Sequence, residues 1–78
     1  MRLAVIFGRN VRRLRKERGL SQEVLADEVG LAVTYVGQLE RGQRNPTLDV
    51  VERFASVFNV EYIELLVNRV VEIESKPG

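Results

Sequence analysis

The most chemically informative part of this sequence is a group of uncharged polar side chains near its middle. Thr34 and Gln38 belong to a stretch from about Val33 to Arg41 whose apolar spacing predicts a helix. The Gln38 amide can pair bidentately with the major-groove edge of an adenine, and the Thr34 hydroxyl can hydrogen-bond a base or touch a thymine methyl. Val33 offers only apolar contact, again best with a thymine methyl. These residues suggest a thin base-reading set with no arginine aimed at guanine, so sequence preference leans on DNA shape and on Tyr35 or Arg41 packing along the groove.

The residues that several other functions require are absent from this sequence. The chain has no histidine and no cysteine, which removes imidazole triads, zinc fingers and disulfides. A phosphate-binding loop is suggested by the spacing of Gly37 and Gly42, but residue 43 is a glutamine where such a loop needs a lysine. The carboxylates fit helix ends and salt-bridged faces. We therefore expect no enzyme, no metal and no cofactor.

Charge is distributed unevenly although the net charge is only +1. Residues 1–20 hold seven basic side chains and a single acid, whereas residues 21–40 hold four acids and no basic side chain. Such asymmetry permits a basic face on a nearly neutral protein.

Length and composition favour one small domain spanning residues 1–78. A chain of this size buries only about 60% of its unfolded surface, so it is expected to be marginal alone and to lean on a second copy. No apolar run is long enough for a signal peptide core or a membrane span. The absence of cysteine fits a reducing cytoplasm.

Apolar spacing between the glycines and prolines is helical throughout and predicts an all-α fold. Five helices are expected, at about residues 3–17, 22–29, 33–41, 48–58 and 61–70. Ser21 and Thr47 are the expected N-caps of the second and fourth helices, and Gly30 and Asn59 are their expected ends. The predicted apolar faces of these helices are, in chain order, Phe7, Val11 and Leu14; Val24, Leu25 and Val29; Val36 and Leu39; Leu48, Val51, Ala55 and Phe58.

Residues 21–42 combine two of these helices in a helix-turn-helix arrangement. Ala26 is small enough for the helices to cross closely, and Gly30 permits a sharp turn between them. Val36 and Leu39 anchor the second helix, so its outer face is free to enter a groove of DNA.

The chain resembles the phage-repressor helix-turn-helix proteins of the Cro/CI or XRE type. The resemblance is carried by Arg12, Leu14, Arg15, Gly19-Leu20-Ser21-Gln22, Leu25-Ala26, Gly30, Tyr35-Val36, Leu39-Glu40-Arg41-Gly42 and Asn45-Pro46-Thr47. It covers about residues 6–66. It implies a compact five-helix bundle of the lambda-repressor-like DNA-binding class.

The resemblance also implies roles for individual residues. The base-reading positions are Val33, Thr34 and Gln38. The DNA-backbone positions are Gln22, Tyr35, Arg41, Gln43, Arg44 and Asn45, of which Gln22 is expected to bind a phosphate and to brace a recognition side chain. Arg15 and Glu40 match an ion pair that links the first helix to the third.

Two residues depart from the family pattern. Ala32 stands where a Ser or Thr usually caps the third helix, and loss of such a cap costs about 1 kcal/mol. Gly37 lies inside the third helix, where glycine costs up to roughly 1 kcal/mol relative to alanine. Its absent side chain either lets the backbone approach DNA or marks a tolerated glycine on a solvent face.

The C-terminal segment is unusually apolar. Eight of the twelve residues from Tyr62 to Ile73 are apolar, more than one buried helical stripe requires. We expect a dimerisation segment at about residues 61–73, the alternative being a helix that only caps the core. Residues 70–75 are compatible with either helix or strand. The expected interface residues are Tyr62, Ile63, Leu66, Val67 and Val70.

These features together predict a homodimeric, sequence-specific transcription regulator that binds double-stranded DNA at a palindromic operator. The dimer would cover a promoter or help to recruit RNA polymerase, which is then a further partner. Among small members of the family, the chain looks most like a controller protein of a restriction–modification system. The alternatives are an antitoxin of a toxin–antitoxin pair and a protein-interaction module that kept the fold without binding DNA.

Overall fold

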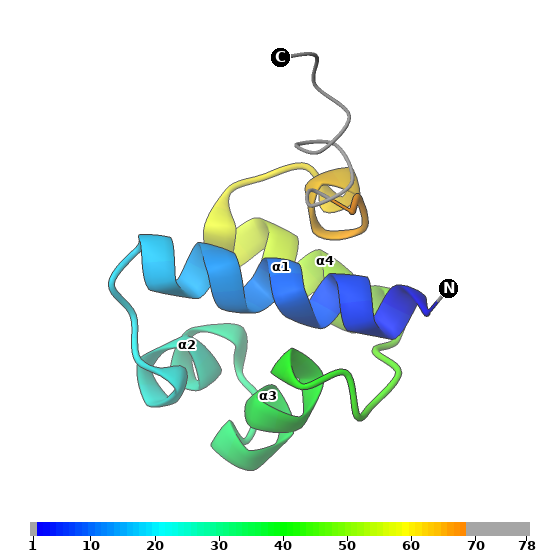
Figure 1. Ribbon diagram of the computed structural model, residues 1–78. Helices are drawn as coiled ribbons and strands as arrows, with labels where there is room; N and C mark the ends of the chain where they lie inside the picture. The colour runs from blue at the N-terminus through cyan, green and yellow to red at the C-terminus, as the bar shows by residue number, and fades with distance from the viewer. Residues whose placement is uncertain (1, 69–78) are drawn as a thin grey trace, which may run out of the picture.

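The computed structural model describes residues 2–68 and is helical, with no strand in that range. Its elements are α1 (Leu3–Glu17), α2 (Gln22–Val29), α3 (Val33–Glu40), α4 (Leu48–Phe58) and a single turn of 3₁₀ helix, η1 (Tyr62–Leu65). Helix α1 crosses the middle of the molecule, with α2 and α3 on one side of it and η1 on the other (Figure 1). The predicted all-α fold is confirmed. None of the helices in this range is long and apolar enough to cross a membrane.

Local capping chemistry sets the helix boundaries. The Ser21 hydroxyl accepts a hydrogen bond from the Val24 amide at 3.0 Å, and the Thr47 hydroxyl accepts one from Val50 at 3.1 Å. Each bond satisfies one of the free amides at a helix start. Gly30 ends α2 in the left-handed conformation, with φ at 74°. Both predicted N-caps are confirmed, and so is the predicted end at Gly30.

The core is formed by one apolar face from each helix. The predicted stripe on α1, Phe7, Val11 and Leu14, is buried. Phe7 meets Phe54 of α4 edge to face, with ring centroids 5.6 Å apart. Edge-to-face aromatic pairs stabilise a core beyond the area they bury.

Two residues predicted to face the core do not. Leu48 is 82% exposed and Val24 is 45% exposed. Leu48 is the first residue of α4, and the buried face of that helix runs instead through Val50, Val51, Phe54, Ala55 and Phe58. The apolar spacing therefore predicted both helices correctly, but it placed Val24 and Leu48 wrongly on their buried faces and missed Val50 and Phe54 of α4.

The prediction of a fifth α-helix is wrong in the type and length of the helix. Residues 62–65 make one turn of 3₁₀ helix, and Leu66 and Val67 follow as a turn and a bend. The Leu66 amide bonds to the Ile63 carbonyl, a spacing of three residues and not the four of an α-helix. Val70 and the question of helix or strand at residues 70–75 lie outside the described residues.

Asn10 of α1 supplies the physical reason for this departure. Its side chain is buried, and its Nδ2 donates to the carbonyl oxygens of Leu65 and Val67, both at 2.9 Å. Its Oδ1 accepts from Arg13 at 3.2 Å. The amide thus binds the backbone of the segment that the sequence predicts to be α-helical and fixes that segment against α1.

Gly8 marks the closest approach of α1 to α3. A Cβ atom built on Gly8 would overlap the carbonyl oxygen of Leu39 and lie 2.9 Å from that of Glu40. Both obstacles are backbone atoms at the end of α3, so neither can turn aside. The role of Gly8 could not be predicted from the sequence, because a glycine inside a helix does not indicate which other segment packs against it.

Replacing Gly8 by alanine should therefore destabilise the protein. Overpacking of this kind costs about 1–3 kcal/mol. In a domain of this size each kcal/mol lowers the melting temperature by roughly 4–8 °C. Gly37→Ala is the matched control, because a Cβ there meets only side-chain ends, the flexible Arg41 guanidinium at 3.3 Å and the Gln22 amide at an ordinary contact distance of 3.7 Å. We expect Gly37→Ala to melt at or above the wild-type temperature. Equal melting of Gly8→Ala and wild type in a circular dichroism scan would contradict the close approach.

Candidate nucleic-acid interface

A three-residue turn joins α2 to α3. Gly30 adopts the left-handed conformation, and the Leu31 amide donates to the Ala26 carbonyl at 3.0 Å. Ala26 and Val36 are both buried, which fixes the two helices against each other. Ala32 begins α3 without a side-chain cap, as its residue type predicts. The helix-turn-helix expected at residues 21–42 is present.

The outer face of α3 gathers the three residues assigned to base reading. Val33 and Thr34 are exposed, and Gln38 is partly exposed one turn further along. Val36 and Leu39 on the opposite face are fully buried. Among residues 2–68, all three candidates for base reading are therefore at least partly accessible to solvent on α3.

The loop after α3 folds back onto this outer face. Arg44 Nη1 donates to Gln38 Oε1 at 3.0 Å, and the Arg44 guanidinium carbon lies 5.1 Å from the centroid of the Tyr35 ring. Arg41 Nε donates to Gln43 Oε1 at 3.2 Å. Four of the six residues assigned to the DNA backbone thus lie on α3 or in the loop after it and contact one another in pairs. Tyr35 contacts Arg44, and Arg41 contacts Gln43.

Arg44 is closer to the base-reading set than the sequence indicates. From the sequence, Arg44 is expected among the phosphate contacts, and no arginine is expected near the bases. The contact with Gln38 joins residues six apart across the end of a helix. Helical periodicity cannot predict a contact of that kind, because it depends on the path of the loop.

The remaining two backbone candidates are placed differently. Asn45 is exposed in the same loop, next to Pro46. Gln22 is partly buried, and its Nε2 donates to Glu40 Oε1 at 2.9 Å. Gln22 therefore braces the buried carboxylate, and none of the three base-reading residues.

The solvent-face interpretation of Gly37 is wrong. Gly37 is buried, and the space beside it is filled by the side chains of Arg41 and Gln22. A Cβ at this position would lie 3.3 Å from the Arg41 guanidinium and 3.7 Å from the Gln22 amide.

The ion pair expected between Arg15 and Glu40 is present and buried. Arg15 Nε lies 2.6 Å from Glu40 Oε2, and Arg15 Nη2 donates to the other carboxylate oxygen at 3.1 Å. The Glu40 side chain is fully buried. Arg15 Nη1 also donates to the Leu20 carbonyl at 2.9 Å, which ties the loop before α2 into the same network.

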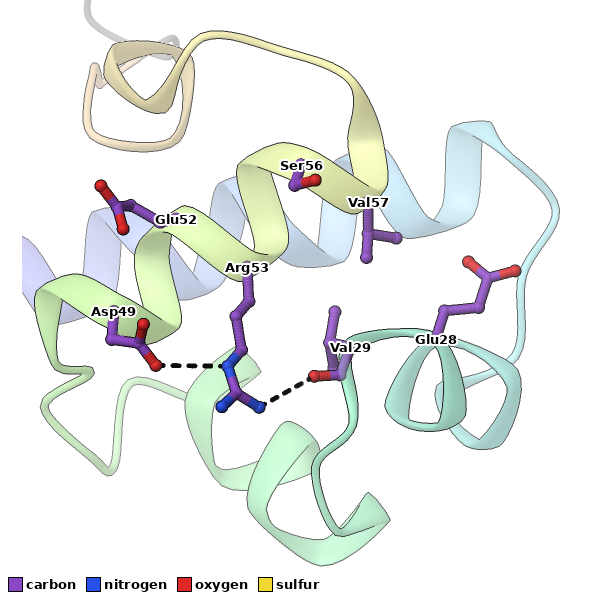
Figure 2. Close-up of a pocket in the computed structure, with 7 residues that line it drawn as sticks. All are labelled: Glu28, Val29, Asp49, Glu52, Arg53, Ser56 and Val57. Carbon is purple, nitrogen blue, oxygen red and sulfur yellow. Dashed lines mark hydrogen bonds and ion pairs between the residues drawn. The ribbon is translucent and has the colours of Figure 1, made fainter.

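The side of the molecule formed by α2 and α4 is predominantly acidic, in contrast to the loop after α3. Figure 2 shows the side chains that line a shallow pocket there, among them the three acidic residues Glu28, Asp49 and Glu52 and one basic residue, Arg53. Arg53 is engaged by Asp49 at 3.2 Å and by the Val29 carbonyl at 3.4 Å. Because uncompensated carboxylates repel phosphates, this side does not suit a nucleic acid backbone. No cluster of potential metal ligands occurs within residues 2–68.

Comparison with known families and proteins identifies the same arrangement. Residues 11–65 match a family model described as helix-turn-helix (HTH_3). The control protein C.SmaI of Serratia marcescens is 41% identical over 66 residues, which cover 85% of this chain and 79% of that protein.

Solved structures of similar proteins share the fold. The restriction–modification controller protein C.AhdI of Aeromonas hydrophila superposes with a TM-score of 0.76 at 47% identity, covering 80% of this chain and 94% of that one. The controller protein C.Esp1396I, solved as a tetramer with its natural 35 base-pair operator, superposes with a TM-score of 0.79 at 27% identity. That match covers 91% of this chain and 97% of that one.

The buried pair predicts a large effect for one substitution. Arg15→Ala leaves the Glu40 carboxylate buried with only Gln22 as a partner, and breaking a buried pair in this way costs about 3–5 kcal/mol. Arg12→Ala is the matched control, because Arg12 is an exposed arginine of the same helix with no ion pair among residues 2–68. Chemical denaturation should show the large loss for Arg15→Ala and less than about 0.5 kcal/mol for Arg12→Ala. Equal stability of the two variants would contradict a structural role for the pair.

Proposed function

The chain belongs to the XRE-type helix-turn-helix family of DNA-binding transcription regulators, and from this premise we propose that it acts as a homodimer on a palindromic operator. The observation that carries the proposal is the outer face of α3, where three side chains suited to base edges are exposed or partly exposed. In this family arrangement the second helix of the motif enters the major groove.

Each protomer reads one half-site with the side chains of α3. Thr34 and Gln38 supply hydrogen bonds to base edges, and Val33 supplies apolar contact to a thymine methyl. Phosphates and sugars are contacted by the residues around this face: Gln22, Tyr35, Arg41, Gln43, Arg44 and Asn45. The backbone contacts position the protein, and the few base contacts select the sequence.

The proposed dimer uses the apolar surface around η1. Tyr62 and Ile63 are 59% and 52% exposed, and Leu66 and Val67 beside them are only partly buried. Leu66 and Tyr62 also line a groove with Leu48, the most exposed large apolar side chain of residues 2–68. A contiguous apolar surface of this kind is typical of an interaction site. The oligomeric state of C.Esp1396I on its operator supports assembly through copies of the same chain.

Control by occupancy follows from this arrangement. A dimer on a promoter either blocks RNA polymerase or helps to recruit it, according to where the operator lies. Because only the dimer engages both half-sites, occupancy rises steeply with the protein's own concentration. The similarity to controller proteins of restriction–modification systems fits a regulator of this type.

Selection from random duplex DNA tests both parts of the proposal. We expect wild type to select an inverted repeat whose half-sites lie one helical turn apart, about 34 Å. Ile63→Asp should sediment as a folded monomer and select a single half-site, with affinity reduced at least about a hundredfold because the second half-site no longer contributes.

Val24→Asp is the control for this experiment. It introduces the same charge at a valine of similar exposure on α2, away from η1. This variant should sediment as a dimer like wild type. A wild-type protein that selects no motif would contradict the DNA-binding part, and one that sediments as a monomer with and without its selected DNA would contradict the dimer.

A further inference from the structure

The amide of Gln38 has one of its two ends occupied. Arg44 Nη1 lies 3.0 Å from the atom assigned as Oε1. A guanidinium has hydrogen-bond donors and no acceptor, so the amide atom that faces it must be the oxygen. The Nε2 end of the amide has no partner within residues 2–68. Gln38 therefore offers free N–H donors to an incoming ligand, while one of the two lone pairs of its Oε1 is already engaged.

A second contact holds Arg44 in this position. Its guanidinium lies over the Tyr35 ring, 5.1 Å from the centroid, a distance at which a cation is attracted to an aromatic face. The ring itself is partly buried and packs against the core. The arginine is thus held between a fixed aromatic platform and the Gln38 oxygen.

Gln38 in contact with Arg44 presents a different pattern of hydrogen-bond donors and acceptors from a glutamine alone. An isolated glutamine matches adenine, because it supplies a donor to N7 and an acceptor to the N6 amino group. With the guanidinium at Oε1, one acceptor position of that oxygen is used, and the cationic N–H groups beside it disfavour the approach of the adenine amino group, which is itself a donor. Guanine presents two acceptors, N7 and O6, in the same part of the major groove. The two N–H donors of Gln38 Nε2 suit these acceptors.

We propose that Arg44 is a positioning residue that sets the base preference of Gln38, so that the two together select guanine and not adenine at one position of each half-site. The inference rests on the proposed function, because it requires α3 to lie in a major groove. It replaces the adenine preference expected for Gln38 from its residue type. Arg44 keeps its role at the DNA backbone through its charge.

Competition binding measures this preference directly. Two duplexes carry the operator selected by wild type, one with guanine and one with adenine at the position that changes when Gln38 is replaced by alanine. Wild type should favour the guanine duplex by about tenfold or more, the discrimination typical of a good bidentate contact. Arg44→Ala should abolish this ratio or invert it toward adenine, because the freed Gln38 oxygen can then accept from the adenine amino group.

Arg41→Ala is the matched control. It removes the same charge from the same segment, but Arg41 bonds to Gln43 and leaves the Gln38 contact intact. We expect it to weaken both duplexes alike. In a Gln38→Ala background, Arg44→Ala should leave the ratio of guanine to adenine binding unchanged, because Arg44 then has no Gln38 amide to contact.

Each outcome decides the proposal. A wild type that favours adenine would overturn it, and so would an Arg44→Ala variant that weakens both duplexes equally, which is the behaviour of a phosphate contact alone. Failure of wild type to select any operator would overturn the proposed function, and this inference with it. A base ratio that changes only when Gln38 is present supports the proposal.

Discussion

The buried pair of Arg15 and Glu40 is the interaction on which the reading surface depends. Glu40 is the last residue of α3, and its carboxylate accepts hydrogen bonds from Arg15 of α1 and Gln22 of α2. Burying a carboxylate is costly unless its partners are well placed, so the arrangement is stable in only a narrow range of geometry. A single carboxylate thus joins three helices and fixes the end of α3.

Helix α1 is the common frame for both proposed surfaces. On one side, Gly8 allows the end of α3 to approach the helix closely. On the other, the buried Asn10 amide holds the carbonyl groups of Leu65 and Val67. The position of the reading helix and the position of the proposed dimer face are therefore both set relative to α1. In a symmetric dimer this geometry determines the separation of the two reading helices.

Local chemistry decided how much could be predicted from the sequence. Ser21, Gly30 and Thr47 act within a few residues of themselves, so they predicted the helix boundaries correctly. The form of residues 62–68 could not be predicted in this way, because it depends on Asn10, which is more than fifty residues away. The candidate site divides similarly. The outward position expected for Gln38 agrees with its partial exposure, but the contact between Gln38 and Arg44 depends on the path of a loop.

The central claim is that the outer face of α3, with the loop after it, is the surface that meets DNA. Titration of the isotope-labelled protein with its selected duplex, followed by amide NMR spectra, tests this claim most directly. We expect the largest shifts at residues 33–38 and 43–45, and small shifts at Glu28, Glu52 and Arg53 on the acidic side formed by α2 and α4. Largest shifts on that acidic side, or uniform small shifts over the whole chain, would contradict the account.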